Sequence, residues 1–356
     1  QDYLGLEKIL NSQHLISEKY GSPAHDEMLF IIIHQVYELW FKQILFELDS
    51  LIGIFSKDEI QESDIGRAVS RLERIIEIQK ILIDQIHVLE TMTPMDFLDF
   101  RDFLIPASGF QSVQFRMIEN KLGLSMENRH SYGGSDYHTS LNELDQEKVK
   151  VSESSDSLFD LMEKWLERTP FLNWGKTSFW DEYEQAVVEM LRDDRHIIET
   201  NAKLSNTQKE KHLIEYEKTE ASFGVVLSSK QHDKLVKEGK WRLSHKATQA
   251  ALLILLYRDQ PILYNPYQLL TKLIDVDELF TAWRYRHVLM VSRMIGRKIG
   301  TGGSTGSDYL NKTAEKHRIF SDISELTTFL IPRSALPQLP QEVENNLGFF
   351  YHVKGK

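Results

Sequence analysis

At 356 residues the chain can bury a sizeable core, and its net charge of -11, with no basic run between aromatic residues, argues against binding to nucleic acid or an anionic membrane. Cysteine is absent, which excludes disulfides, a thiolate nucleophile and thiolate-ligated haem or iron–sulfur clusters, and fits a reducing compartment. No apolar run approaches the roughly 18 residues of a membrane span, and the first residues do not resemble a signal peptide, so we expect a cytoplasmic protein.

The first third of the chain predicts a series of helices. Ser22-Pro23 is typical of a helix start, with Asp26 and Glu27 as first-turn acids, and Gly123 is placed to end the last helix of this series. Thr93-Pro94 separates two of the helices. The expected helices cover residues 4–10, 26–55, 65–92, 95–104 and 110–122.

From residue 124 the character of the sequence changes. Residues 124–157 are polar and lack periodicity, which predicts a loop or mobile insertion, and residues 207–240 predict pieces of a solvated outer helical layer. Asn265-Pro266 is expected to open one helix and Asp277 the next. Further helices are expected over residues 158–168, 178–204, 241–257, 267–274, 277–296 and 307–330.

These elements favour an all-α fold, since no alternating strand and no internal repeat is visible. We expect a main helical domain formed by residues 1–123 and 241–331. Residues 124–240 would then be a polar insertion with a smaller outer helical domain, and the proline-rich residues 332–356 a C-terminal tail.

The segment 277–296 carries an apolar stripe with one titratable member. Its inward positions lie 3, 4, 3 and 4 residues apart, as one face of an amphipathic helix requires. His287 stands in the middle of this face, and an imidazole taken out of water needs a hydrogen bond or a metal. The stripe consists of Phe280, Trp283, His287, Met290 and Met294.

A second histidine occupies an equivalent position near the N-terminus. His34 lies in an apolar seam with Phe30, Tyr37 and Phe41, again at helical spacing. Two inward-facing histidines on two aromatic-rich helices could line one pocket. One of them could ligate a metal or cofactor while the other faces a substrate.

Two further features are candidates for ligand contacts. The glycine-rich segment 300–306 has no strand before it and no Lys-Ser/Thr after it, so it is either a helix connector or a lid that offers the Thr301 hydroxyl. Arg101 stands among phenylalanines. It is either a surface arginine whose aliphatic stem packs on these rings or a buried guanidinium that binds a carboxylate with two hydrogen bonds. Arg116 is a salt-bridge partner unless a cofactor supplies carboxylates.

The histidines do not specify a zinc site, because neither HxxxH nor HExxH is present. His25, Asp26 and Glu27 near His34 could suggest non-haem iron, although the two acids also suit a first helical turn. A haem held by one imidazole in an aromatic slot fits His287 with the fewest assumptions.

Long motifs in this sequence resemble the tryptophan 2,3-dioxygenase family, with its animal-type members as the nearest expected match. Residues 124–157 and 205–240 match that pattern poorly. The motifs are HDEMLFIIIHQVYELWFKQILFELDS (25–50), LETMTPMDFLDFRDFLIPASGFQSVQFRMIENKLG (89–123), WLERTP (165–170), WRYRHVLMVSRMIGRKIGTGGSTGSDYL (283–310) and FLIPR (329–333).

The resemblance implies a large helical haem-binding fold, one b-type haem per subunit and a homotetramer. It implies insertion of both atoms of O2 across the indole C2=C3 bond of L-tryptophan, which gives N-formyl-L-kynurenine in the first step of tryptophan catabolism. The rival hypothesis is a haem-based sensor without turnover, which would need His287 but would have no use for Arg101 or a glycine lid.

The resemblance also implies roles for the residues around the two histidines. His287 corresponds to the proximal haem ligand and His34 to the distal histidine that meets the indole N–H. Phe30 corresponds to a pocket wall, Phe97 to an indole contact and Arg101 to the clamp on the substrate carboxylate.

The remaining implied contacts lie further out. Thr301 is similar to a lid residue that meets the substrate's ammonium and carboxylate groups, and Tyr3 to a tyrosine that enters a neighbouring subunit's pocket. Ser108 would lie near the distal haem face, Arg116 near a haem propionate, and Trp283 among the cofactor contacts. Trp165 and Arg168 could line a second indole site, although a plain helix end also explains them.

Overall fold

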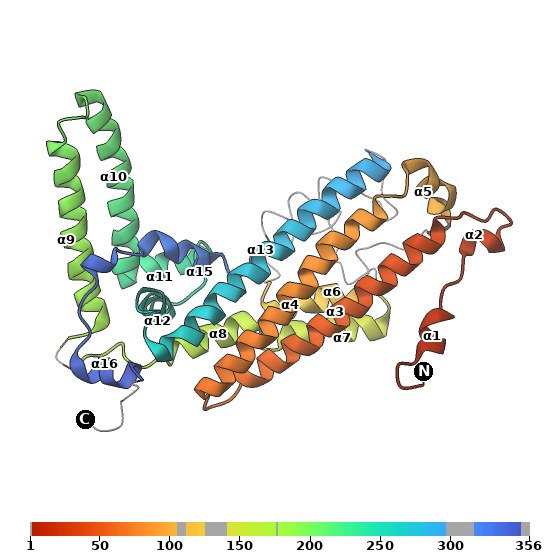
Figure 1. Ribbon diagram of the computed structural model, residues 1–356, viewed down its shortest axis with the longest axis horizontal. Helices are drawn as coiled ribbons and strands as arrows, with labels where there is room; N and C mark the ends of the chain where they lie inside the picture. Colours follow the sequence, from red (N-terminus) through yellow and green to blue (C-terminus); the bar gives the residue numbers. More distant parts are fainter. Residues whose placement is uncertain (1, 105–111, 125–140, 176, 297–316, 350–356) are drawn as a thin grey trace, which may run out of the picture. The chain divides into compact units, whose positions relative to one another are not determined.

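The computed structural model describes residues 2–104, 112–124, 141–175, 177–296 and 317–349 (Figure 1). Over these ranges the chain forms α-helices and short 3-10 helices, and the β pairing found there is one isolated bridge between Asn173 and Ser178. The predicted all-α class is confirmed.

The chain divides into two compact units. The first comprises residues 1–58, 70–159 and 275–319, and the second residues 59–69, 160–274 and 320–356. This division differs from the predicted domains, because α7 (Glu143–Ser154) packs on α6 (Val113–Leu122) within the first unit. The long α13 (Pro261–Ile295) also begins in the second unit and continues into the first.

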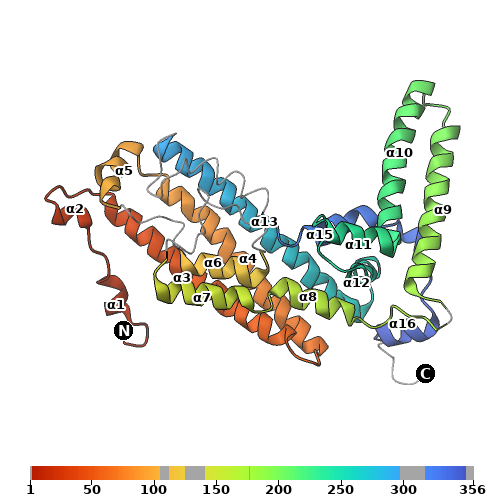
Figure 2. The same ribbon diagram turned by 180° about the vertical axis from the view of Figure 1, so that it is seen from behind.

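The first unit is built around α3 (Glu27–Phe55). This helix runs beside α4 and α13, and α6 packs against it (Figures 1 and 2). The other elements of this unit are α1 (Leu6–Leu10), α2 (Ile16–Lys19), α4 (Glu62–Leu89, which begins in the second unit), α5 (Pro94–Arg101), and the 3-10 helix η1 (Asp102–Leu104).

The second unit contains an antiparallel helical hairpin of α9 and α10, visible in Figure 1. Each of these helices starts with a capping box, made by Ser178 with Asp181 and by Ser205 with Gln208. The predicted helical pieces in residues 207–240 are thus confirmed. The elements are α8 (Leu158–Glu167), α9 (Phe179–Thr200), α10 (Asn206–Leu227), α11 (Ser229–Lys237), α12 (His245–Leu256), α15 (Ser321–Glu325), η5 (Leu326–Phe329), η6 (Arg333–Ala335) and α16 (Gln341–Leu347).

The start of α3 differs from the prediction. The helix begins at Glu27 and not at Pro23, because residues 22–24 fold back onto Ser17: the N–H of Ser22 donates to the Ser17 carbonyl at 3.2 Å. The end of α6 agrees with the prediction. Gly123 closes it with φ +115°, where a Cβ would lie 2.7 Å from the Cβ of Phe159.

The predicted break at Asn265-Pro266 is wrong, since α13 is one helix of 35 residues. Pro266 is only its sixth residue, so the proline removes a single hydrogen bond near the helix start. Asp277 does not open a helix either. It is buried and accepts a hydrogen bond of 2.9 Å from the Ile319 N–H, which fixes the returning chain to α13.

Two other predicted segments need correction. The expected loop 124–157 contains α7, which Asn142 caps through its side chain. The expected helix 307–330 lies partly outside the described residues, and from residue 317 onward it is replaced by the short α15 and η5.

Helix α3 is long and apolar enough to suit a membrane span, with a mean hydropathy of 1.2 in its most apolar window, so the expectation that no segment approaches a span is too strict. Its acidic side chains nevertheless form ion pairs and hydrogen bonds within the first unit. Glu47 is buried and pairs with Arg74 at 2.7 Å, and Glu38 accepts hydrogen bonds from Ser112 and Gln114. We therefore interpret α3 as a core helix.

Candidate active site

The two histidines singled out by the sequence lie close together in the first unit. Their helices, α3 and α13, are joined by ring contacts of Trp283 with Tyr37 and Phe41, at centroid distances of 6.2 and 6.3 Å. The two imidazoles lie close enough that a proton on His34 would contribute to lowering the pKa of His287. The chain thus brings both imidazoles to one region.

His34 presents one nitrogen as an acceptor. Its Nδ1 lies 2.7 Å from the carbonyl oxygen of Phe30, which can only accept, so Nδ1 carries the proton and the neutral ring keeps a lone pair on Nε2. Burial lowers the pKa of His34, against the hydrogen bond to Phe30 and the charge of Glu38, which raise it. Solvent still reaches the side chain, but protein atoms surround the ring closely enough to disfavour its charged form.

His287 is neutral as well. Burial lowers its pKa to about 4, and a positive charge on His34 would add to the effect. The ring stacks on Trp283 at a centroid distance of 5.3 Å and an interplanar angle of 9°, which restrains its plane. A neutral imidazole has a lone pair for a metal ion at physiological pH.

Trp283 adds a buried donor beside His287. In the part of the chain that the structure describes, its Nε1 makes no hydrogen bond of normal geometry. The nearby Tyr37 hydroxyl donates instead to the Leu82 carbonyl at 2.6 Å. Burial raises the pKa of Tyr37 to about 12, and a weak hydrogen bond with Trp283 opposes this only in part. The Trp283 N–H thus has only this weak interaction with the Tyr37 hydroxyl, and a polar ligand group would satisfy it better.

An aromatic wall faces His34. The ring of Phe30 packs against the His34 ring at a centroid distance of 4.0 Å and a tilt of 35°, and contacts that of Phe97 of α5 at 6.0 Å. The orientation of α5 is set at its start, where Thr93 and Asp96 form a capping box. The structure therefore brings Phe30, His34 and Phe97 together.

Two members of the aromatic surroundings were not singled out from the sequence. Phe100 is fully buried and lies 5.5 Å from Phe30, and Phe115 of α6 lies 5.1 Å from Trp283. The contact of Phe100 could have been predicted, because Phe97 and Phe100 have the i, i+3 spacing of one helix face. The contact of Phe115 depends on how α6 packs, which local spacing does not reveal.

Arg101 ends α5, next to this wall. The sequence left two interpretations of Arg101, a surface arginine and a buried guanidinium that binds a carboxylate. Its side chain is only 17% exposed, which fits the second interpretation better. Its Nη1 lies 3.6 Å from Oδ1 of Asp102, whose own side chain is 83% exposed. A carboxylate so well hydrated holds a guanidinium weakly.

Arg116 belongs to a buried ion-pair network. It donates to Glu119 at 2.9 Å, and Glu119 also accepts from Arg284 of α13 at 3.0 Å. Arg284 in turn donates to the His317 carbonyl at 3.4 Å. This agrees with a salt-bridge role, while a contact of Arg116 with a haem propionate stays a prediction.

The remaining candidates are not brought to this region. Tyr3 precedes α1 and is 99% exposed, so it does not line a pocket of its own chain. Ser108 and Thr301 lie outside the described residues, as does the whole glycine-rich segment. In the second unit, Arg168 donates from Nε to the Lys164 carbonyl at 3.3 Å, as at a plain helix end.

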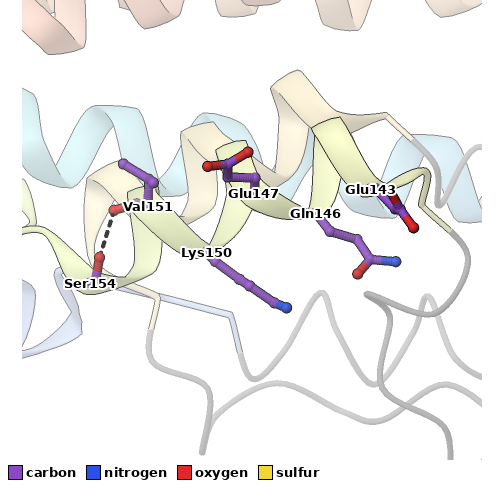
Figure 3. Close-up of a pocket in the computed structure, with 6 residues that line it drawn as sticks. All are labelled: Glu143, Gln146, Glu147, Lys150, Val151 and Ser154. Carbon is purple, nitrogen blue, oxygen red and sulfur yellow. Dashed lines mark hydrogen bonds between the residues drawn. The ribbon is translucent and has the colours of Figure 1, made fainter.

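Other potential sites carry less weight. Figure 3 shows an open groove of about 470 Å³ whose lining residues all come from α7 and include none of the candidates. Within the described ranges no group of three or more His, Asp or Glu side chains could hold a metal ion.

The first unit is thus helical and brings two histidines with lowered pKa values together with an aromatic wall and a partly buried arginine. The tryptophan 2,3-dioxygenase family model matches residues 1–330. The chain belongs to the tryptophan 2,3-dioxygenase family, as predicted.

Relatives in this family cover nearly the whole chain. It is 53% identical to tryptophan 2,3-dioxygenase of Bdellovibrio bacteriovorus, over 98% of each chain. It is 47% identical to that of Dictyostelium discoideum, over 99% of this chain and 88% of the other, and 46% identical to tryptophan 2,3-dioxygenase B of Danio rerio, over 95% and 83%. Of these relatives the bacterial protein is the most similar, and the fish enzyme also matches over most of its length.

Proposed function

We propose that this protein oxidises L-tryptophan with O2 to N-formyl-L-kynurenine, inserting both oxygen atoms across the indole C2=C3 bond. Membership of the tryptophan 2,3-dioxygenase family over nearly the full length supports this. The structural observation that carries it is the pairing of neutral His34 and His287 beside the wall of Phe30 and Phe97.

The cofactor in this proposal is one haem b per subunit. The residues present fit it: His287 offers a neutral nitrogen, and Trp283 a buried N–H that has only a weak interaction with the Tyr37 hydroxyl among the described residues. His287 would ligate the iron, with Trp283, Arg116 and Ser108 as further cofactor contacts. When bound, haem supplies the binding and activation of O2.

The substrate contacts follow from the chemistry of tryptophan. The bare Nε2 of His34 can accept the indole N–H, and Phe30 and Phe97 can flank the ring. Arg101 would bind the carboxylate in a bidentate pair, which a guanidinium does better than an ammonium. Thr301 would meet the ammonium and carboxylate groups.

A direct test is to add L-tryptophan to the ferrous haem protein in air and to follow the absorbance of N-formylkynurenine. Stoichiometric product per O2 consumed is the expected result. A protein that binds O2 reversibly and forms no product would instead be a haem-based sensor, the rival function.

We expect His34→Ser to keep haem and to lower turnover by roughly tenfold to a hundredfold, because it removes one hydrogen bond that orients the indole. N-methylation of the indole nitrogen removes the same contact, so the mutation should hardly change the turnover of 1-methyltryptophan. Haem content and steady-state kinetics measure both effects. If His34→Ser loses its haem, the roles of His34 and His287 must be exchanged or merged.

The proposal includes a cytoplasmic homotetramer in which Tyr3 completes a neighbouring pocket. The exposed side chains of Tyr3 and Leu4 are free to contact a neighbouring subunit, as such an exchange requires. Deleting residues 1–6 should weaken tryptophan binding and oligomer stability together and keep haem, whereas Tyr3→Ala should weaken binding alone. Light scattering beside a tryptophan titration tests this; a deletion variant that is fully assembled and binds normally would contradict it.

A further inference from the structure

Residues 12–24, called here the N-terminal strap, run antiparallel to the first turns of α3. Gln13 donates to the side chain of Gln35 at 2.6 Å, and Gln35 donates back to the Ser12 carbonyl at 3.4 Å. Further along the strap, Ser17 is bound to Glu27, which precedes Gln35 on α3. The strap therefore flanks the part of α3 that carries Phe30 and His34.

Glu27 fastens the strap. This carboxylate is 1% exposed and accepts hydrogen bonds from the N–H of Ile16 at 2.8 Å, from the N–H of Ser17 at 3.1 Å and from the Ser17 hydroxyl. The Ser17 oxygen accepts in turn from the Ala24 N–H at 3.0 Å. A buried carboxylate bound in this way holds the strap in one position, because each lost partner would leave a buried charge less satisfied.

The strap then reaches the element that carries Arg101. Tyr20 stacks on Phe103 of η1 with a centroid distance of 4.9 Å and an interplanar angle of 5°. Phe103 stands two residues after Arg101, at the end of α5 opposite to its capping box. In both views α2 lies beside α5 and the start of α3 (Figures 1 and 2).

We propose that Tyr20 and Glu27 are positioning residues that hold Arg101 in place for the carboxylate of an amino-acid substrate. Glu27 fixes the strap, the strap places Tyr20, and the stack on Phe103 restrains the end of α5. The inference rests on the proposed function for its substrate, but the contact between strap and α5 can be measured without one.

The binding test compares L-tryptophan with tryptamine, which lacks the carboxylate, on the haem-loaded protein. Tyr20→Ala should raise the Kd for L-tryptophan by roughly twofold to tenfold, which corresponds to the usual energy of a stacked aromatic pair. The Kd for tryptamine should stay unchanged. Tyr20→Phe keeps the ring and should bind as wild type. Tyr264→Ala, at a 57% exposed tyrosine of the second unit, is the matched control.

The second test is hydrogen exchange at residues 97–104 without substrate. Tyr20→Ala and Glu27→Gln should both speed exchange there, and Tyr20→Phe should not. Unchanged exchange in both variants, unchanged L-tryptophan affinity in Tyr20→Ala, or an equal loss for tryptamine would overturn the proposal. If wild type binds neither compound, the proposed function fails, while exchange still decides the role of the strap.

Discussion

His287→Ala is expected to abolish the haem Soret band of the purified protein, or to leave a haem whose binding depends on added imidazole. The substitution removes the single protein ligand that we assign to the iron and leaves a space of imidazole size against Trp283, whose ring stacks on His287 at 5.3 Å. Because Trp283 and the apolar stripe stay in place, free imidazole can take up the vacated position.

The matched control is His87→Ala, in the same unit but with a side chain 60% exposed, which should keep the full Soret band. Far-ultraviolet circular dichroism of both variants separates ligand loss from unfolding, since the helices should persist. Normal haem content and an unchanged spectrum in His287→Ala would remove His287 from its assigned role.

Helical periodicity placed both candidate histidines on the helix faces that meet in the first unit, since the stripes that hold them repeat at helical spacing. It did not predict their burial, because His287 is half-buried and the side chain of His34 is exposed to solvent. The capping glycine Gly123 could be identified in the same way, because only the left-handed conformation at that position ends α6 as observed.

Long-range partners could not be predicted. Asp277 suits a helix start by local rules, but its partner is the N–H of Ile319, 42 residues away. Glu27 likewise suits a first helical turn, while its contacts with Ser17 depend on the fold of the preceding strap. Arg284 meets Glu119 across 165 residues, a pairing that no spacing rule contains.

The other large effect is expected at Arg101. Arg101→Ala should lower kcat/KM for L-tryptophan by at least about tenfold to a hundredfold, since a buried charge-assisted pair with a carboxylate is worth roughly 2–5 kcal/mol. The activity toward tryptamine should be the same in the variant and in wild type. Arg101→Lys should recover only part of the loss, because an ammonium cannot form the bidentate pair.

Asp102 provides the sharpest control for this assignment. Its carboxylate lies 3.6 Å from Arg101, and its 83% exposed side chain makes it a weak competitor for the guanidinium. Asp102→Asn should therefore bind L-tryptophan as well as wild type or slightly better, since it removes an anion that a substrate carboxylate would displace.

If Arg101 served only to pair with Asp102 and to stabilise the end of α5, both substitutions would destabilise the protein alike, and Arg101→Ala would lower activity toward L-tryptophan and tryptamine equally. Parallel melting curves and kinetics with the two substrates distinguish these outcomes.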